Sequence, residues 1–219
     1  MHEAMTESTV ALAGHRSPFE GHVDGAQASA SGKIGVRLHA HTLPGAVQIA
    51  TWPAAIAALE QALTRVLALA GPLPARTGQV AELAQAMLMR TGPQEFLLVT
   101  ATGEPMVAAL RAHIPSDIGS VTDLGHARCR IRISGDACVA TLGKLFALDF
   151  RETVFPVGEL RLTGHHHVPC SLHRRAPDRF DLYVFTTYAH DQLATVLDAA
   201  REHGVALALG ADRTPEERS

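Results

Sequence analysis

An apolar strand leads directly into a helix in Ala46-Val-Gln-Ile-Ala-Thr-Trp-Pro-Ala-Ala-Ile-Ala-Ala-Leu-Glu-Gln-Ala-Leu63, and the same arrangement returns in Arg128-Cys-Arg-Ile-Arg-Ile-Ser-Gly-Asp-Ala-Cys-Val-Ala-Thr-Leu142. Around each stretch the chain follows one order: strand, helix, connector, two strands and helix, over residues 46–114 and 128–203. Alternating apolar residues predict half-buried strands, and apolar residues three and four apart predict amphipathic helices. A repeated unit of this kind, with helices packed on sheets, predicts an α+β fold of two similar halves.

The same patterns divide the chain into four parts. Residues 1–32 are rich in Gly, Ser, Ala and His without a sustained period, which predicts an irregular N-terminal arm. Residues 33–118 form the first α+β half, residues 119–209 the second half, and residues 210–219 a polar tail. Among the expected elements are strands at Lys33–Ala40, Phe96–Thr100, Ala127–Ser134, Phe180–Phe185 and Val205–Leu209, and helices at 53–69, Glu104–His113, Gly135–Phe146 and Ala189–His203, the last ended by Gly204.

Composition excludes several classes of protein. A chain of 219 residues with a formal net charge of −3 has no basic footprint for phosphate groups, so we expect no nucleic-acid partner. No run approaches the ~18 apolar residues that a membrane span requires, and we expect no membrane partner. The three cysteines are odd in number and lack metal-site spacing, which favours a reducing compartment. The chain is therefore expected to be cytoplasmic.

Arginine occupies every second position of one predicted strand, at Arg128, Arg130 and Arg132. The residues between them are apolar and belong to the opposite face of that strand. The arginine face is expected to be solvated, with an acidic neighbour as the alternative.

Arginine suits desolvated ion pairs better than lysine does, and tryptophan is a frequent anchor of protein interfaces. Trp52, just before the first expected helix, is expected to fill an edge of the core, with an interface anchor as the alternative. The candidate interface residues are Trp52, Arg128, Arg130, Arg132, Arg151, Arg174 and Arg175.

Motifs that mark common active sites are missing from the sequence: it has no dinucleotide or P-loop glycine pattern, no nucleophile elbow and no HExxH. On a strand, His165 and His167 would point the same way and could grip a metal with Cys170 or His173, but we expect a polar, partly exposed strand. We therefore predict no catalytic, cofactor-binding or metal-binding residue in this chain.

Asp123 and His126 would face opposite sides of an extended strand, so they are not expected to form a catalytic pair. We expect Asp123 to cap a turn, with His126 hydrogen-bonded nearby. Cys129 and Cys138 fall on the predicted buried faces and are expected to behave as small hydrophobes.

A resemblance to a known family rests on the order and spacing of several blocks over residues 34–204. The blocks in the second half are Val121-Thr-Asp-Leu-Gly-His-Ala-Arg-Cys-Arg-Ile-Arg-Ile-Ser-Gly135, Phe155-Pro-Val-Gly158, Val168-Pro-Cys-Ser-Leu-His-Arg-Arg175 and Phe180-Asp-Leu-Tyr-Val184, and the main block in the first half is Leu88-Met-Arg-Thr-Gly-Pro-Gln-Glu-Phe-Leu-Leu-Val99. With these blocks in this order and spacing, the chain resembles the gamma-subunit family of heterotetrameric sarcosine oxidases.

The resemblance implies a duplicated βαββα fold, with two ferredoxin-like units that exchange their first strands as in the folate-binding domain of aminomethyltransferases. It implies a non-catalytic gamma subunit that packs chiefly against alpha in a complex with alpha, beta and delta subunits. Such complexes oxidatively demethylate sarcosine or a related N-methyl amino acid. FAD, FMN, NAD and zinc would then lie in the partner subunits, with no cofactor in this chain.

The same fold also allows a free-standing folate-binding or aminomethyl-transferring protein. Asp123 is the candidate acidic residue for a cavity in that alternative. A third possibility is an interaction module of a different assembly, in which the His-rich N-terminal arm makes the contact.

Overall fold

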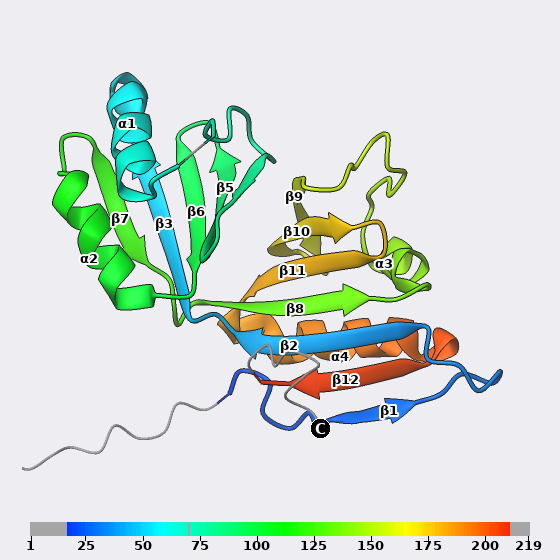
Figure 1. The fold of residues 1–219 in the computed structure, drawn as a ribbon. Helices are drawn as coiled ribbons and strands as arrows, with labels where there is room; N and C mark the ends of the chain where they lie inside the picture. Colours follow the sequence, from blue (N-terminus) through cyan, green and yellow to red (C-terminus); the bar gives the residue numbers. More distant parts are fainter. Residues whose placement is uncertain (1–16, 70, 211–219) are drawn as a thin grey trace, which may run out of the picture.

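The computed structural model describes residues 17–69 and 71–210, which form two β-sheets with helices on one face of each (Figure 1). Residues 1–16 of the predicted arm and 211–219 of the predicted tail lie outside the described residues. The α+β fold class predicted from the repeated strand–helix pattern is confirmed. Within the described residues, no helix has the length and apolar character that crossing a membrane requires.

The larger sheet has seven strands in the described part of the chain, in the order β1-β12-β2-β8-β11-β10-β9. Neighbouring strands are antiparallel except for β12 and β2, which pair in parallel. The bounds are β1 (Gly25–Gln27), β12 (Val205–Leu209), β2 (Val36–Thr42), β8 (Arg128–Ser134), β11 (Arg179–Phe185), β10 (Val168–Ala176) and β9 (Leu160–His165).

The smaller sheet, counted over the same described ranges, has five antiparallel strands in the order β4-β5-β6-β3-β7. The bounds are β4 (Val80–Glu82), β5 (Ala86–Gly92), β6 (Glu95–Thr100), β3 (Gly45–Thr51) and β7 (Gly119–Asp123).

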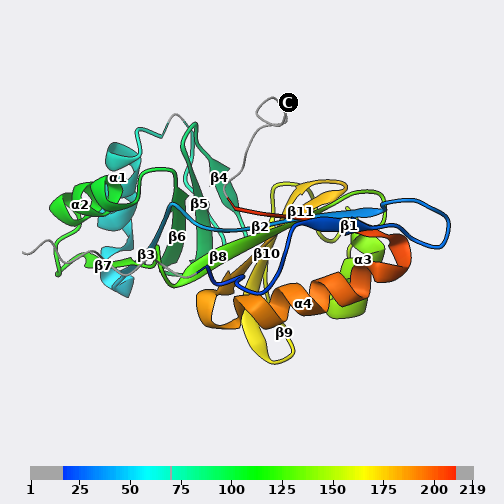
Figure 2. The same cartoon turned by 90° about the horizontal axis from the view of Figure 1, so that it is seen from below.

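Helices cover one face of each sheet, as the view from below shows (Figure 2). Leu59 and Leu63 of α1 and Leu110 of α2 close an apolar core on the smaller sheet. Leu142 of α3 and Leu193 of α4 belong to the corresponding core of the larger sheet. The helices are α1 (Ile56–Val66), α2 (Gly103–His113), α3 (Cys138–Leu145) and α4 (Ala189–Ala200), with short 3-10 turns at Pro53–Ala55, Thr186–Tyr188 and Arg201–His203.

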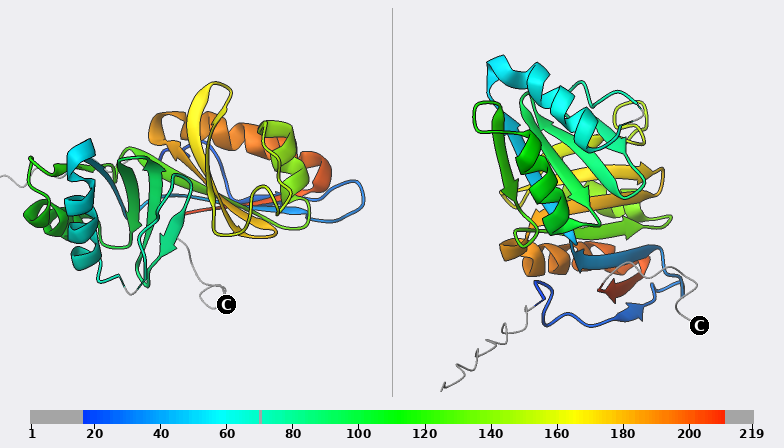
Figure 3. Two further views of the ribbon diagram at one scale, coloured as in Figure 1. Left: turned by 90° about the horizontal axis from the view of Figure 1, so that it is seen from above. Right: turned by 60° about the vertical axis from the view of Figure 1, so that its left-hand side comes forward.

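The two faces without helices meet each other, because the smaller sheet stands against one end of the larger sheet (Figure 3). A third apolar cluster forms there from both sheets. Its buried members are Leu43, Ala46, Met87, Met89, Leu97, Leu160 and Tyr183.

Each half of the sequence gives its first strand to the other sheet. β2 precedes β3 in the chain but lies in the larger sheet between β12 and β8, and β7 precedes β8 but pairs with β3 at the edge of the smaller sheet. The exchanged first strands implied by the resemblance are confirmed. Two short connections, residues 43–44 and 124–127, therefore carry the chain between the sheets.

Most expected elements are found, with shifts at their ends. The first helix ends at Val66 rather than continuing to residue 69, and the helix expected from Gly135 begins at Cys138. The last helical segment ends at Gly204 as expected, where φ is +75° and a Cβ atom would lie 2.0 Å from the Lys33 carbonyl oxygen, a position that only glycine tolerates.

The described end of the predicted arm is more structured than its composition suggests. β1 pairs with β12 at the edge of the larger sheet, and Phe19 is buried in the core beneath α4. A strand of three exposed residues has no apolar alternation, so its composition alone reads as irregular.

Candidate functional site

The face of the larger sheet that turns toward the smaller sheet carries a row of arginines. Arg128, Arg130 and Arg132 lie on β8 opposite its apolar residues, which face the helices. Arg130 is only 8% exposed, and Arg128 and Arg132 are half-buried. The expected solvated face is wrong, because the smaller sheet stands over it. The alternative, an acidic neighbour, is what the structure shows.

That neighbour is Asp181 on β11, which is fully buried and pairs in register with Arg132. Arg132 donates from Nε to Oδ1 at 2.8 Å and from Nη2 to Oδ2 at 3.2 Å, and Arg130 Nη1 lies 3.6 Å from Oδ2. Burial acts to raise the pKa of Asp181, but the hydrogen bonds and charges of the arginines outweigh it and the pKa is lowered. A charged carboxylate thus joins two arginines inside the molecule.

His173 and Tyr183 are fully buried on the same face of the sheet. Among the described residues, the two ring nitrogens of His173 have no hydrogen-bond partner, and the hydroxyl of Tyr183 has none either. Burial, aided by the charge of Arg175 and opposed by that of Asp181, lowers the pKa of His173 to about 4. Burial likewise raises the pKa of Tyr183. Both side chains are therefore neutral near pH 7.

Arg174 and Arg175 are neighbours on β10 but point to opposite sides of the sheet. Arg174 is 5% exposed and donates to the carbonyl oxygens of Phe150, Phe155 and Pro177, so its contacts are internal. Arg175 reaches across to the smaller sheet, where its Nη2 lies 3.4 Å from Glu82 Oε2.

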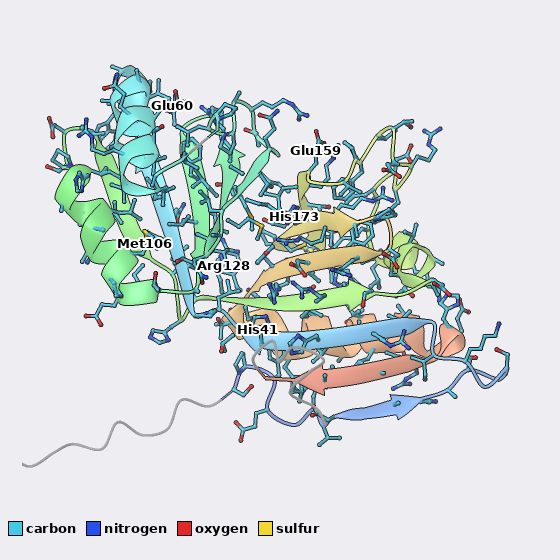
Figure 4. The ribbon with its side chains drawn as sticks, in the orientation of Figure 1. His41, Glu60, Met106, Arg128, Glu159 and His173 are labelled. Carbon is cyan, nitrogen blue, oxygen red and sulfur yellow. The ribbon has the colours of Figure 1, made fainter. Side chains whose placement is uncertain are left out.

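Two cavities lie between the sheets, beside the third apolar cluster. One of about 520 Å³ is bordered by His41, Glu82, Met87, Arg130 and Arg175. The other, of about 250 Å³, has residues of the smaller sheet on one side and Arg128, with its β9 and β10 neighbours, on the other. Figure 4 labels His41 and Arg128 near the junction of the two sheets.

Trp52 does not fill an edge of the core. It is 58% exposed, and its indole Nε1 donates to the carbonyl oxygen of Ser116 at 3.0 Å. The expected core role is wrong, because Trp52 lies exposed at the surface, immediately before the 3-10 turn that begins at Pro53. The interface role of Trp52 and of the candidate arginines stays a prediction.

The three consecutive histidines do not form a strand. His165 ends β9, whereas His166 and His167 form the two-residue turn to β10 with φ values of +47° and +65°. The buried His165 ring bonds through Nδ1 to Gln192 Oε1 at 2.6 Å. Because only His165 continues the strand, the pattern on which the metal hypothesis depended does not exist. In residues 17–69 and 71–210, no group of three or more His, Cys, Asp or Glu is placed to hold a metal ion.

Asp123 caps a turn as expected, since its Oδ1 accepts a hydrogen bond from the Gly125 amide at 2.8 Å. It is exposed and does not border either cavity between the sheets. The cysteines are buried and unpaired as expected, and burial raises the pKa of Cys129 to about 12 and that of Cys138 to about 11. Both thiols are therefore protonated near pH 7 and are not activated nucleophiles.

The sequence is similar to those of curated proteins along most of its length. The sequence is 27% identical over 189 residues to the gamma subunit of sarcosine oxidase from Arthrobacter sp, covering 85% of this chain and 90% of the relative. The gamma subunit from Corynebacterium sp. (strain P-1) is 26% identical with the same coverage. This chain is a relative of sarcosine oxidase gamma subunits. No protein-family model matches the sequence.

Solved structures agree with the fold. Heterotetrameric sarcosine oxidase from Corynebacterium sp. U-96, in complex with pyrrole 2-carboxylate, contains a chain that superposes with a TM-score of 0.69 at 20% identity, covering 82% of this chain and 88% of that one. Aminomethyltransferase T of the glycine cleavage system from Bartonella henselae superposes with a TM-score of 0.57 at 16% identity, covering 80% of this chain and 48% of that one. The fold is shared by both.

The residues that sequence reasoning missed are Asp181, which pairs with two of the arginines, and Tyr183, which is buried on the same face. Asp181 and Tyr183 alternate with Leu182 and Val184, which is the same period-two signal that exposed the arginines of β8. The sequence shows an acid on one strand and a row of arginines on another. Only the pairing of β8 with β11 in the structure makes them neighbours.

Proposed function

We propose that this chain is the non-catalytic gamma subunit of a sarcosine-oxidase-type complex, which oxidatively demethylates sarcosine or a related N-methyl amino acid. The observation that carries the proposal is the similarity to sarcosine oxidase gamma subunits over 85% of this chain and 90% of the relative. The exchanged strands of the fold support it.

A structural role is supported by how the charged groups are used. Asp181 is bound by two arginines, Glu82 by Arg175, and Glu159 by Arg161 at 2.6 Å and by Arg76. The pairs of Glu82 with Arg175 and of Glu159 with Arg76 link the two halves of the molecule, and all of these contacts leave the carboxylates engaged. We propose that the chemistry belongs to alpha, beta and delta, which carry FAD, FMN, NAD and zinc.

Packing against a large partner is supported by exposed apolar side chains. Trp52 is 58% exposed and Tyr188 45%, and exposed aromatic residues of this kind supply much of the binding energy of interfaces. We propose that alpha is the chief partner and that the complex is cytoplasmic.

The experiment is purification of the affinity-tagged chain from its native cells. We expect it to co-purify with flavin-containing large subunits, identified by mass spectrometry and visible absorption, and the assembly should release peroxide with N-methylglycine. Trp52→Ala should weaken co-purification, whereas Val154→Ala, also exposed, serves as the control for loss of an apolar surface group. Purification without flavoprotein partners would contradict the proposal, and micromolar binding of tetrahydrofolate by the lone chain would favour the free-standing alternative.

A further inference from the structure

The smaller of the two cavities between the sheets contains a cation without a hydrogen-bonded acid. Arg128 stacks on the ring of Phe185, with its guanidinium carbon 3.7 Å from the ring centroid. Its Nε is buried and has no hydrogen-bond partner among the described residues. By contrast, Arg132, four positions along the same strand, has Asp181 as a bidentate partner.

Stacking on Phe185 fixes the orientation of the guanidinium without using its N–H groups. A planar guanidinium whose face lies on a ring keeps its edge available, and that edge matches a carboxylate with two parallel hydrogen bonds. Burial lowers the pKa of Arg128, while the charge of Glu95 opposes this effect. The unpaired cation is therefore a cost that an incoming carboxylate would offset.

Glu95 lines the same cavity from the smaller sheet. Its two oxygens accept hydrogen bonds from Gln48 Nε2 at 2.8 Å and from Thr91 Oγ1 at 2.7 Å. These bonds orient the carboxylate, and because an ionised carboxylate has about four acceptor sites, about two remain for a further donor. Glu95 forms no ion pair with Arg128 among the described residues, although both face one cavity.

Size and lining restrict what the cavity could hold. Its volume of about 250 Å³ is below the range usual for drug-sized ligands, so neither a flavin nor a folate would fit. Leucine, proline and phenylalanine form much of the remaining wall, and Thr163 and Ser171 add hydroxyls. The apolar lining residues are Leu97, Leu124, Leu162, Pro169 and Phe185.

We propose that this cavity binds a small zwitterion of the α-amino acid class, with Arg128 receiving its carboxylate and Glu95 its ammonium group. The site is formed by both sheets, so occupation would also join the two halves of the chain. The proposal depends on this chain's own residues and does not require the function proposed above.

The test is calorimetric titration of the full chain with glycine, acetate and methylammonium, each alone. Glycine should bind most tightly, because only glycine engages both charged groups. Arg128→Gln should weaken glycine and acetate binding about tenfold or more, as expected for the loss of a charge-assisted pair. Glu95→Gln should weaken glycine binding and leave acetate binding unchanged.

Arg37→Gln is the matched control, because Arg37 is an exposed arginine of the larger sheet that borders neither cavity. It should leave all three affinities unchanged, and circular dichroism establishes that each variant is folded. Glycine binding that survives Arg128→Gln would overturn the proposal. So would equal affinities for glycine and acetate, or the lack of glycine binding at tens of millimolar.

Discussion

The two faces of the larger sheet are built from alternate residues of the same strands, but they are stabilised in different ways. On β11, Phe180, Leu182 and Val184 enter the apolar core beneath α3 and α4, whereas Asp181 and Tyr183 face the smaller sheet. One face depends on the burial of apolar area. The other depends on a carboxylate that neutralises buried arginines.

The two faces of the larger sheet also differ in what covers them. Helices α3 and α4 cover an apolar face with an apolar face. The smaller sheet covers the arginine face only in part, with a cluster around Met87, Met89 and Leu97, and leaves cavities lined by charged residues. Stability and binding capacity are thus separated onto opposite faces of one sheet.

The largest expected effect comes from removing the acid of the arginine face. Asp181→Asn removes a buried carboxylate charge from beside Arg130 and Arg132, which should lower the free energy of unfolding by about 3–5 kcal/mol. Urea denaturation followed by circular dichroism measures it. Asp198→Asn, at an exposed ion pair with Arg201, should cost less than about 1 kcal/mol. Similar losses for the two variants would mean that the buried network is not stabilising.

A smaller effect should appear as a dependence of stability on pH. His173 has a pKa of about 4 in the folded chain against 6.5 when unfolded, so the unfolded state takes up the proton first as pH falls. The free energy of unfolding is therefore highest above about pH 6.5. It should fall by roughly 3 kcal/mol in total as the pH is lowered toward 4. Urea midpoints measured between pH 7 and 4 should fall less steeply for His173→Gln than for the natural chain.

Leu172→Ala is the control for this pH series, because Leu172 is the buried neighbour of His173 on the apolar face. It should lower stability by about 2–5 kcal/mol through a cavity, with the slope against pH unchanged. A natural chain whose stability is flat from pH 7 to 4 would contradict the lowered pKa of His173 in the folded state.

Sequence reasoning went furthest where a local period decides the structure. The alternation of β8 and the spacing of α4 predict both elements, and Gly204 predicts the end of the last helix. It failed where the answer depends on what lies across from a side chain. The arginines of β8 have the pattern of a solvated strand face, but the smaller sheet covers them, and Trp52 has a large apolar ring that nevertheless lies exposed. Similarly, the sequence of His165–His167 is compatible with a strand, but His166 and His167 have positive φ values and form the turn of a hairpin.

The smallest expected effect concerns Tyr183, whose buried hydroxyl forms no hydrogen bond with the described residues. Its ring packs in the cluster between the sheets, so Tyr183→Phe keeps the apolar contacts and removes only the oxygen. Because a buried polar group without a partner is unfavourable, the variant should be more stable by about 1 kcal/mol. Urea midpoints measure the change, and Tyr188→Phe, at an exposed tyrosine, should show none. A loss of stability in Tyr183→Phe would mean that the hydroxyl is satisfied in solution, and the arginine face would then be a fully paired polar layer.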